Sequence, residues 1–109
     1  MITRKVKGNV TNVYTLADLK LDTKTRQVTR GNDIIELSAK EYAILEVLIR
    51  NAGTVLTREK IESGAWNYDY IGGTNVIDVY IRYLRKKIDD GYEKKLIHTV
   101  RGVGYVLKE

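Results

Sequence analysis

A short stretch in the last third of the chain concentrates the side chains best suited to holding phosphate groups. Four of the six residues from Arg82 to Lys87 are cationic and none is acidic. Lysine and arginine at this density can neutralise a polyanion such as a nucleic acid, whereas a basic helical stripe in general is more often a solvated surface. Charge alone therefore leaves nucleic-acid binding and a plain solvent-exposed face equally open.

Val79 and Arg101 favour the nucleic-acid interpretation. Val79 lies within the basic side of the same segment, where a β-branched apolar residue gains nothing from water but can contact a thymine methyl group in a major groove. Arg101 stands between Val100 and Gly102 at the tip of a predicted hairpin, and Gly102 and Gly104 let the backbone approach another surface closely. An arginine on such a tip can enter a minor groove.

The sequence favours neither catalysis nor a metal or cofactor site. It has no cysteine and a single histidine, His98, which excludes disulfides, thiol catalysis and almost every zinc site. We expect a structural or phosphate-neighbouring role for His98, because a lone histidine makes no acid–base system. Gly102 and Gly104 form a GxG without the following helix of a dinucleotide site, and we interpret them as turn glycines.

Length and composition indicate one globular domain. The 109 residues are 43% hydrophobic and 30% charged, a balance typical of a soluble chain. The net charge of +5 favours a polyanionic partner only modestly. The longest apolar stretch, residues 42–49, is interrupted by Glu46 and too short to cross a bilayer, and the N-terminus lacks the apolar segment of a secretory signal. We therefore expect a cytoplasmic protein.

Two helices are expected in the middle of the chain. Ser38 followed by Glu41 forms a capping box that starts a helix at about Ala39, with Gly53 as its stop signal. The second helix is expected to be capped by Thr57. Its Gly64 weakens it by about 1 kcal/mol relative to alanine.

The basic segment is predicted to be a third helix, from Thr74 or Asn75 to about Asp89. Its apolar positions lie on one side of a helical wheel and predict a buried face: Ile77, Tyr80, Ile81, Leu84 and Ile88. The opposite side collects Asn75, Asp78, Val79, Arg82, Arg85 and Lys86, with Tyr83 at its edge.

Strands are expected at both ends of the domain. Residues 1–13 are interpreted as a flexible tail or the remnant of an interdomain linker, and residues 14–109 as the domain. Residues 14–37 predict three or four short antiparallel strands, with a turn signal at residues 31–33. Residues 95–109 predict two strands joined by a tight turn at residues 101–104. Helix, turn, helix, loop, basic helix and hairpin is the element order of a winged helix-turn-helix, an α+β fold.

Four segments in order resemble the DNA-binding effector domain of OmpR/PhoB-family response regulators. They are LSAKEYAILEVL at 37–48, VLTREKI at 55–61 with Trp66 following, NVIDVYIRYLRKKI at 75–88 and TVRGVGYVL at 99–107. The resemblance covers nearly all of residues 14–108. It implies a four-stranded antiparallel N-terminal sheet, three helices and a C-terminal hairpin wing, with tandem head-to-tail binding to direct-repeat promoter sites.

The resemblance also implies roles for individual residues. Positions that reach bases in the family correspond to Asn75, Val79, Tyr83 and Arg101, of which Asn75 could also contact phosphate. Positions that contact or neighbour phosphates correspond to Trp66, Tyr80, Arg82, Arg85, Lys86 and Thr99. The loop expected to contact RNA polymerase contains Asn67, Tyr68, Asp69 and Tyr70.

The chain departs from the family pattern at three points. Tyr83 occupies a position where several members have arginine, so a guanine contact expected there is in doubt. Gly64 interrupts a helix that is usually free of glycine. The phosphorylatable receiver domain of the family is not encoded in the thirteen residues before Tyr14, so we interpret the chain as an excised domain or a stand-alone relative.

The sequence thus predicts a sequence-specific double-stranded DNA binder that regulates transcription and is not an enzyme. Phosphate contacts supply its affinity and a few side chains on the third helix supply its specificity. Two alternatives remain: a winged helix that binds protein without DNA, and a non-specific binder of single strands or RNA.

Overall fold

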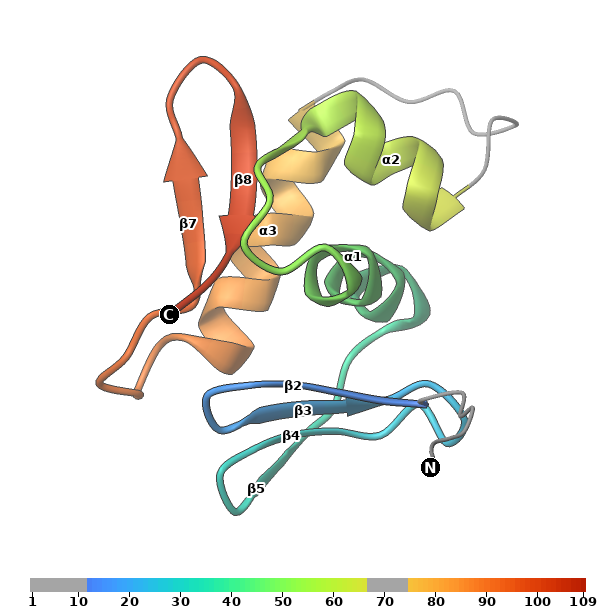
Figure 1. The fold of residues 1–109 in the computed structure, drawn as a ribbon, viewed down its shortest axis with the longest axis vertical. Coiled ribbons are helices and arrows are strands. Elements are labelled where there is room, and N and C mark those ends of the chain that lie inside the picture. Colours follow the sequence, from blue (N-terminus) through green and yellow to red (C-terminus); the bar gives the residue numbers. More distant parts are fainter. Residues whose placement is uncertain (1–11, 67–74) are drawn as a thin grey trace, which may run out of the picture.

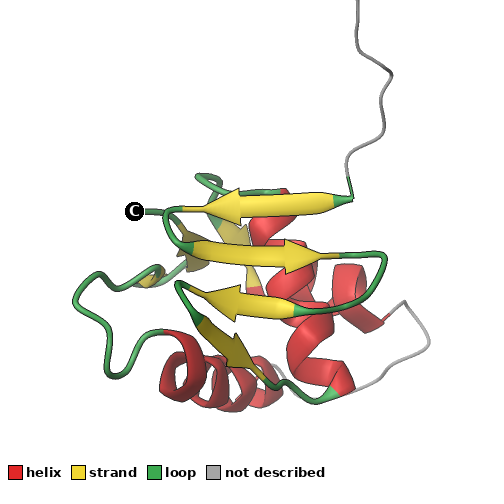
Figure 2. Ribbon diagram, turned by 90° about the horizontal axis from the view of Figure 1, so that it is seen from below, coloured by secondary structure: helices red, strands yellow, loops and turns green. Residues whose placement is uncertain are grey.

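Short strands with alternating polar and apolar residues form an antiparallel sheet at the N-terminal end of the domain. The computed structural model describes residues 12–66 and 75–109. Four strands pair in sequential order: β2 (Val13–Leu16), β3 (Leu19–Asp22), β4 (Val28–Arg30) and β5 (Asp33–Ile35). Figure 2 shows them side by side, with helices behind the sheet. The expected four-stranded sheet is confirmed.

Alternation along these strands selects the residues that enter the core. Leu19, Leu21 and Val28 are buried, whereas Lys20 between the two leucines is exposed. Strand β2 begins at Val13, one residue before the expected domain boundary, and residues 1–11 of the expected tail lie outside the described residues.

The turn between β4 and β5 lies where the sequence predicted one. Gly31 adopts a left-handed φ of 61°, which glycine takes without steric penalty. Asp33, expected as part of the turn, already pairs with Arg30 as the first residue of β5.

Helix α1 (Ala39–Arg50) begins at the predicted capping box. The Ser38 hydroxyl accepts a hydrogen bond from the Glu41 N–H at 3.2 Å, and Glu41 Oε1 accepts one from the Ser38 N–H at 2.8 Å. The helix ends before Gly53, whose φ is 87°. Its buried apolar side chains are Tyr42, Ile44, Leu45, Leu48 and Ile49.

Helix α2 (Arg58–Trp66) is capped by Thr57, whose hydroxyl accepts from the Lys60 N–H at 3.1 Å. The structure corrects the interpretation of Gly64 as only a weak point. A Cβ built at Gly64 would lie 3.2 Å from Cγ2 of Val47 on α1, tighter than ordinary packing. Alanine at this position would strengthen the helix but would also force Val47 to shift, so the glycine allows α1 and α2 to pack closely.

The C-terminal hairpin belongs to a second sheet that the sequence predicted only in part. Strands β7 (Ile97–Val100) and β8 (Gly104–Leu107) form the expected hairpin, and β6 (Leu56–Thr57) pairs with the other side of β8. The interpretation of Gly104 as a turn residue is wrong, because it begins β8 opposite Thr57. A Cβ built at Gly104 would lie 1.9 Å from the Leu56 carbonyl oxygen, so β6 and β8 approach each other closely there.

The third helix, α3 (Asn75–Ile88), completes the core between the two sheets. Its apolar side meets α1 and the hairpin, with Ile77, Ile81, Leu84 and Ile88 fully buried. Figure 1 shows the hairpin and the N-terminal sheet at opposite ends of the molecule, with α1 between the sheet and α2. Among the described residues, no helix has the length and apolar character needed to cross a membrane.

Candidate DNA interface

Helix α3 presents a basic surface because its apolar residues are used on the opposite side. Arg82, Tyr83 and Lys86 are exposed, and Val79 is half-buried one turn before Tyr83. Arg82 and Lys86 are four residues apart and therefore lie on the same side of the helix. Val79 precedes Arg82 by three residues, so the two lie on the same side of the helix, as the sequence predicted.

The residues predicted to contact bases lie on two separate elements. Val79 and Tyr83 belong to α3, and Asn75 is its first residue. Arg101 is exposed in the connection between β7 and β8, beside Gly102, whose φ of 77° lies in the left-handed region. The Val103 N–H donates to the Val100 carbonyl at 3.0 Å and closes this turn. The hairpin therefore carries Arg101 on a short turn with defined backbone geometry.

Two residues predicted to contact phosphate meet each other. Arg85 Nη2 donates to Oγ1 of Thr99 at 2.6 Å and to the Ile97 carbonyl at 3.2 Å. The guanidinium also lies 5.6 Å from the ring centroid of Tyr105 on β8. These contacts hold the Arg85 side chain between α3 and the hairpin, so that a phosphate at this place would meet a pre-positioned guanidinium and hydroxyl.

Three aromatic residues continue this surface toward α2. The rings of Trp66 and Tyr80 are 5.6 Å apart and those of Tyr80 and Tyr83 are 5.7 Å apart, both in edge-to-face geometry. Trp66 and Tyr80 pack against the core while remaining partly accessible. Their rings therefore serve packing, and part of each residue remains at the surface.

The contacts of Asp78 are the feature that sequence reasoning missed. The wheel placed this acid on the outer, basic side of α3, but its carboxylate accepts from Arg58 Nε at 2.8 Å and from the Tyr105 hydroxyl. Burial alone would raise the pKa of Asp78; the bonds from Tyr105 and Arg58 outweigh it and hold the pKa below its ordinary 3.8. No local pattern could reveal this cluster, because the partners lie 20 and 27 residues away.

The Asp78 cluster links three elements that surround the candidate interface. Arg58 begins α2, Asp78 lies in the first turn of α3 and Tyr105 lies in β8. The Arg58 guanidinium also lies 5.4 Å from the Tyr105 ring centroid. The negative charge of Asp78, which alone would repel a polyanion, is therefore compensated by the Arg58 cation and by the hydrogen bond from the Tyr105 hydroxyl.

Other polar residues have structural contacts. His98 Nε2 lies 3.1 Å from the Lys108 carbonyl oxygen, a contact that pairs the ends of β7 and β8. Within residues 12–66 and 75–109, no group of three or more histidine, aspartate and glutamate side chains could hold a metal ion. The loop Asn67–Tyr70, predicted to contact RNA polymerase, lies outside the described residues.

Comparison with known proteins identifies the family. Residues 31–107 match the family described as "Transcriptional regulatory protein, C terminal". The uncharacterized transcriptional regulatory protein YkoG of Bacillus subtilis (strain 168) is 54% identical over 94 residues, which are 86% of this chain and 41% of YkoG.

Two solved structures share the fold. The response regulator DrrB of Thermotoga maritima, an OmpR/PhoB homologue, superimposes with a TM-score of 0.78 at 35% identity, covering 90% of this chain and 45% of DrrB. The DNA-binding domain of RstA from Klebsiella pneumoniae, solved with the RstA box, gives a TM-score of 0.78 at 30% identity, covering 90% of this chain and 98% of that domain.

The chain thus spans less than half of the length of YkoG and of DrrB, and almost all of the RstA domain. The family that residues 31–107 match consists of DNA-binding regulators of transcription and is not a family of enzymes. The chain belongs to the OmpR/PhoB family of transcriptional regulators, as the winged-helix DNA-binding domain that lies at their C-terminus.

Proposed function

We propose that this domain binds a specific duplex sequence by inserting α3 into the major groove and Arg101 into the adjacent minor groove. Val79 and Tyr83 contact bases, together with Asn75 at the start of the helix. Two sets of backbone contacts fix the register on DNA. One set is Tyr80, Arg82, Arg85 and Lys86 on α3, and the other is Thr99 on β7 and Trp66 at the end of α2.

The observation that carries this proposal is the charge of the exposed side of α3. Arg82 and Lys86 project from it, while Asp78 is paired with Arg58 and Tyr105. An isolated carboxylate in a groove would be repelled by the phosphates on both sides. Its internal pairing leaves the positive charge of this surface dominant.

We infer the wider assembly from what the resemblance to the family implies. We place the domain at the C-terminal end of a two-component response regulator, after a receiver domain that a sensor kinase phosphorylates. Two copies bind head to tail on direct-repeat promoter sites in the bacterial cytoplasm, and residues 67–70 contact RNA polymerase. The length of the relatives supports this arrangement, since each has room for a further domain.

Selection of duplexes from a random pool tests the proposed function. The chain is expected to enrich one motif, with an affinity that falls steeply as the salt concentration rises. Enrichment of no motif, an affinity that ignores ionic strength, or preference for unpaired strands would each reject the proposal. A winged helix that binds protein and not DNA would enrich no motif, so the same selection separates that alternative from the proposed function.

Two substitutions separate phosphate contacts from base contacts. Arg82→Ala is expected to weaken binding to selected and shuffled duplexes by a similar factor, because a phosphate contact carries no sequence information. Val79→Ala is expected to change the preferred base more than the affinity, since it removes the methyl groups offered to thymine. Fluorescence anisotropy and a repeated selection measure both effects.

The matched control is Lys24→Ala, which removes one exposed charge from the turn between β3 and β4. It should leave the selected motif unaltered and binding nearly unchanged. If Val79→Ala selects the same motif as the unmodified chain, Val79 makes no base contact.

A further inference from the structure

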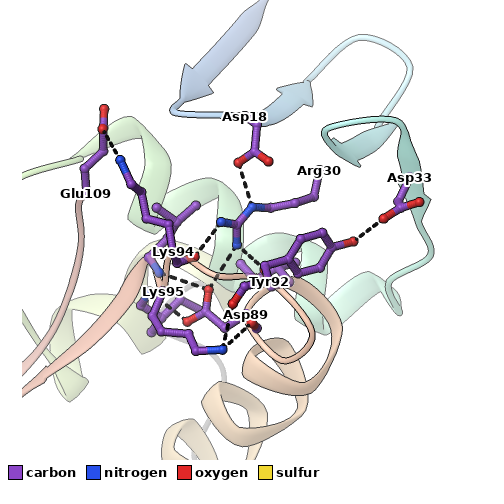
Figure 3. A network of polar contacts seen from close by, with 11 residues as sticks. Asp18, Arg30, Asp33, Asp89, Tyr92, Lys94, Lys95 and Glu109 are labelled. Carbon is purple, nitrogen blue, oxygen red and sulfur yellow. Dashed lines mark hydrogen bonds and ion pairs between the residues drawn. The ribbon is translucent and has the colours of Figure 1, made fainter.

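One buried arginine fastens the C-terminal end of α3 to the N-terminal sheet. Arg30, the last residue of β4, is 2% exposed, and its guanidinium reaches beyond the sheet toward the end of the helix (Figure 3). Nη1 donates to the carbonyl of Ile88, the last residue of α3, and lies 3.4 Å from Oδ1 of Asp89. Nε donates to Asp18 Oδ1 at 2.8 Å, and Nη2 donates to the Lys94 carbonyl.

Asp89 continues this connection into the hairpin. It directly follows α3, and its two carboxylate oxygens accept from the N–H groups of Leu96 at 3.0 Å and Ile97 at 3.1 Å. Ile97 is the first residue of β7. One carboxylate therefore joins Arg30, the end of the helix and the start of the hairpin.

The loop between α3 and β7 is held at further points. The ring centroid of Tyr92 lies 4.6 Å from the Arg30 guanidinium carbon, and the Tyr92 hydroxyl donates to Asp33 on β5 at 2.7 Å. Lys95 Nζ donates to the carbonyls of Asp89 and Tyr92 at 2.9 and 2.8 Å (Figure 3). Contacts from the sheet, from the loop itself and from Asp89 thus limit how the hairpin can move relative to α3.

A stability role alone does not explain this arrangement. Removing a guanidinium from water is costly, and apolar replacements for buried ion pairs are often neutral or stabilising. The planar guanidinium offers what an apolar side chain lacks: several donors with fixed directions, here aimed at two carboxylates and two carbonyls. The helix end also favours a cation, because its last carbonyls are the negative end of the helix dipole.

We propose that Arg30 and Asp89 are positioning residues for DNA recognition, which hold α3 and the β7–β8 hairpin in one relative orientation. This inference rests on the proposed function, in which α3 and Arg101 occupy neighbouring grooves at the same time. Both residues are buried, at 2% and 3% exposure, and act through the elements they join. If α3 and the hairpin moved independently, a duplex could bind with the bases preferred by one element and lack those preferred by the other.

Arg30→Lys is the first test. Lysine keeps the charge but carries one donor group, which cannot reach Asp18, Ile88 and Lys94 together. Residual dipolar couplings measure the orientation of the hairpin relative to α3, and binding to singly substituted duplexes measures discrimination at each base. Bases read by the hairpin are defined as those whose discrimination Arg101→Ala abolishes.

The expected result is a selective loss. Arg30→Lys should change the measured orientation and lower discrimination at the hairpin-read bases about tenfold, the size of one base contact. The salt dependence of binding should remain, because the phosphate contacts of α3 are kept. Arg26→Lys is the matched control: Arg26 lies in the same sheet region, exposed over the Tyr42 ring, and should change neither measurement.

Asp89→Asn is the second variant and should cause the same selective loss, since it keeps the size of the side chain but not its charge. If the unmodified chain selects no motif, the proposed function fails and the positioning role fails with it. If it selects a motif and folded Arg30→Lys keeps both the orientation and the discrimination, only the positioning role is overturned. Failure of both variants to fold would assign the pair to stability and also overturn the proposal.

Discussion

Asp78 shows how a single residue depends on neighbours that are distant in sequence. Its carboxylate lies in the first turn of α3, where the helix dipole favours a negative charge, and it is joined there by Arg58 and Tyr105. Burial of Tyr105, with the added effect of Asp78, raises the pKa of that hydroxyl. The raised pKa keeps this hydroxyl protonated, and therefore a donor to Asp78, up to a higher pH than that of an ordinary tyrosine.

The hydrogen bond from the Tyr105 hydroxyl is expected to lower the pKa of Asp78. In Tyr105→Phe the burial of Asp78 remains but one of its hydrogen bonds is lost, so its pKa should move up from below 3.8. Carbon-detected NMR titration of the Asp78 carboxyl group measures the change. Tyr83→Phe removes a hydroxyl from the exposed side of α3 and serves as the control; an equal shift in both variants would contradict the assignment.

At the scale of elements, the two glycines of the hairpin have different tasks. Gly102 has a positive φ of 77° with open space where a side chain would be, whereas Gly104 abuts the Leu56 carbonyl of β6. The first position needs a backbone conformation, and the second needs the absence of a side chain. Sequence reasoning treated them alike, because both lie in the same GxG motif.

Gly104→Ala is expected to destabilise the domain more than Gly102→Ala. The Cβ at position 104 must push β6 away from β8, at a cost of about 2–4 kcal/mol. The Cβ at position 102 meets nothing and costs only the left-handed conformation, about 1–2 kcal/mol. Urea unfolding gives both free energies, and the reverse order would show that β6 adapts without loss.

The elements that sequence predicts well are those whose signals are local. Ser38 and Glu41 lie three residues apart and mark the start of α1, and the 3.6-residue period assigns the buried side of α3. The sequence did not predict strand β6, because its two residues, Leu56 and Thr57, are too few to show an alternating pattern. It pairs with β8 at Gly104, which is far away in the chain and close in space.

The candidate interface also has one part that the sequence predicts and another that only the fold reveals. The basic side of α3 and the hairpin turn could be predicted, because charge and glycine spacing are visible along the chain. The pairing of Arg85 with Thr99 and the cluster around Asp78 required the fold, since their partners belong to different elements. The roles of these residues toward DNA remain predictions that the proposed experiments test.

On the scale of the whole molecule, ion pairs tie α3 to three other elements. Arg58 of α2 pairs with Asp78 near its start, and Glu41 of α1 pairs with Lys87 near its end. Arg30 of β4 pairs with Asp89 immediately after it. The helix that carries the candidate base contacts is thereby fixed along its length, which reduces the entropy lost when it binds.

The Glu41–Lys87 pair makes the stability of the whole domain depend on pH. Burial would raise the pKa of Glu41, but hydrogen bonds from Lys87 and Ser38 prevail and hold it below its ordinary 4.5. Above pH 4.5 Glu41 is ionised in both the folded and the unfolded chain, and the pair contributes fully. As the pH falls, the unfolded chain takes up the proton first, so this contribution is lost as the pH passes through the lower folded pKa.

Lys87→Met is expected to lower the free energy of unfolding by about 1 kcal/mol at pH 7, a modest value because Lys87 is 40% exposed and screened by solvent. The deficit should shrink below pH 4.5, since a protonated Glu41 no longer needs its cation. Urea unfolding at a series of pH values measures this difference. Lys86→Met removes a neighbouring charge from the exposed side of the same helix and should show no such convergence. A deficit of Lys87→Met that stays constant down to pH 3 would mean that packing of the lysine stem, and not its charge, joins α1 to α3.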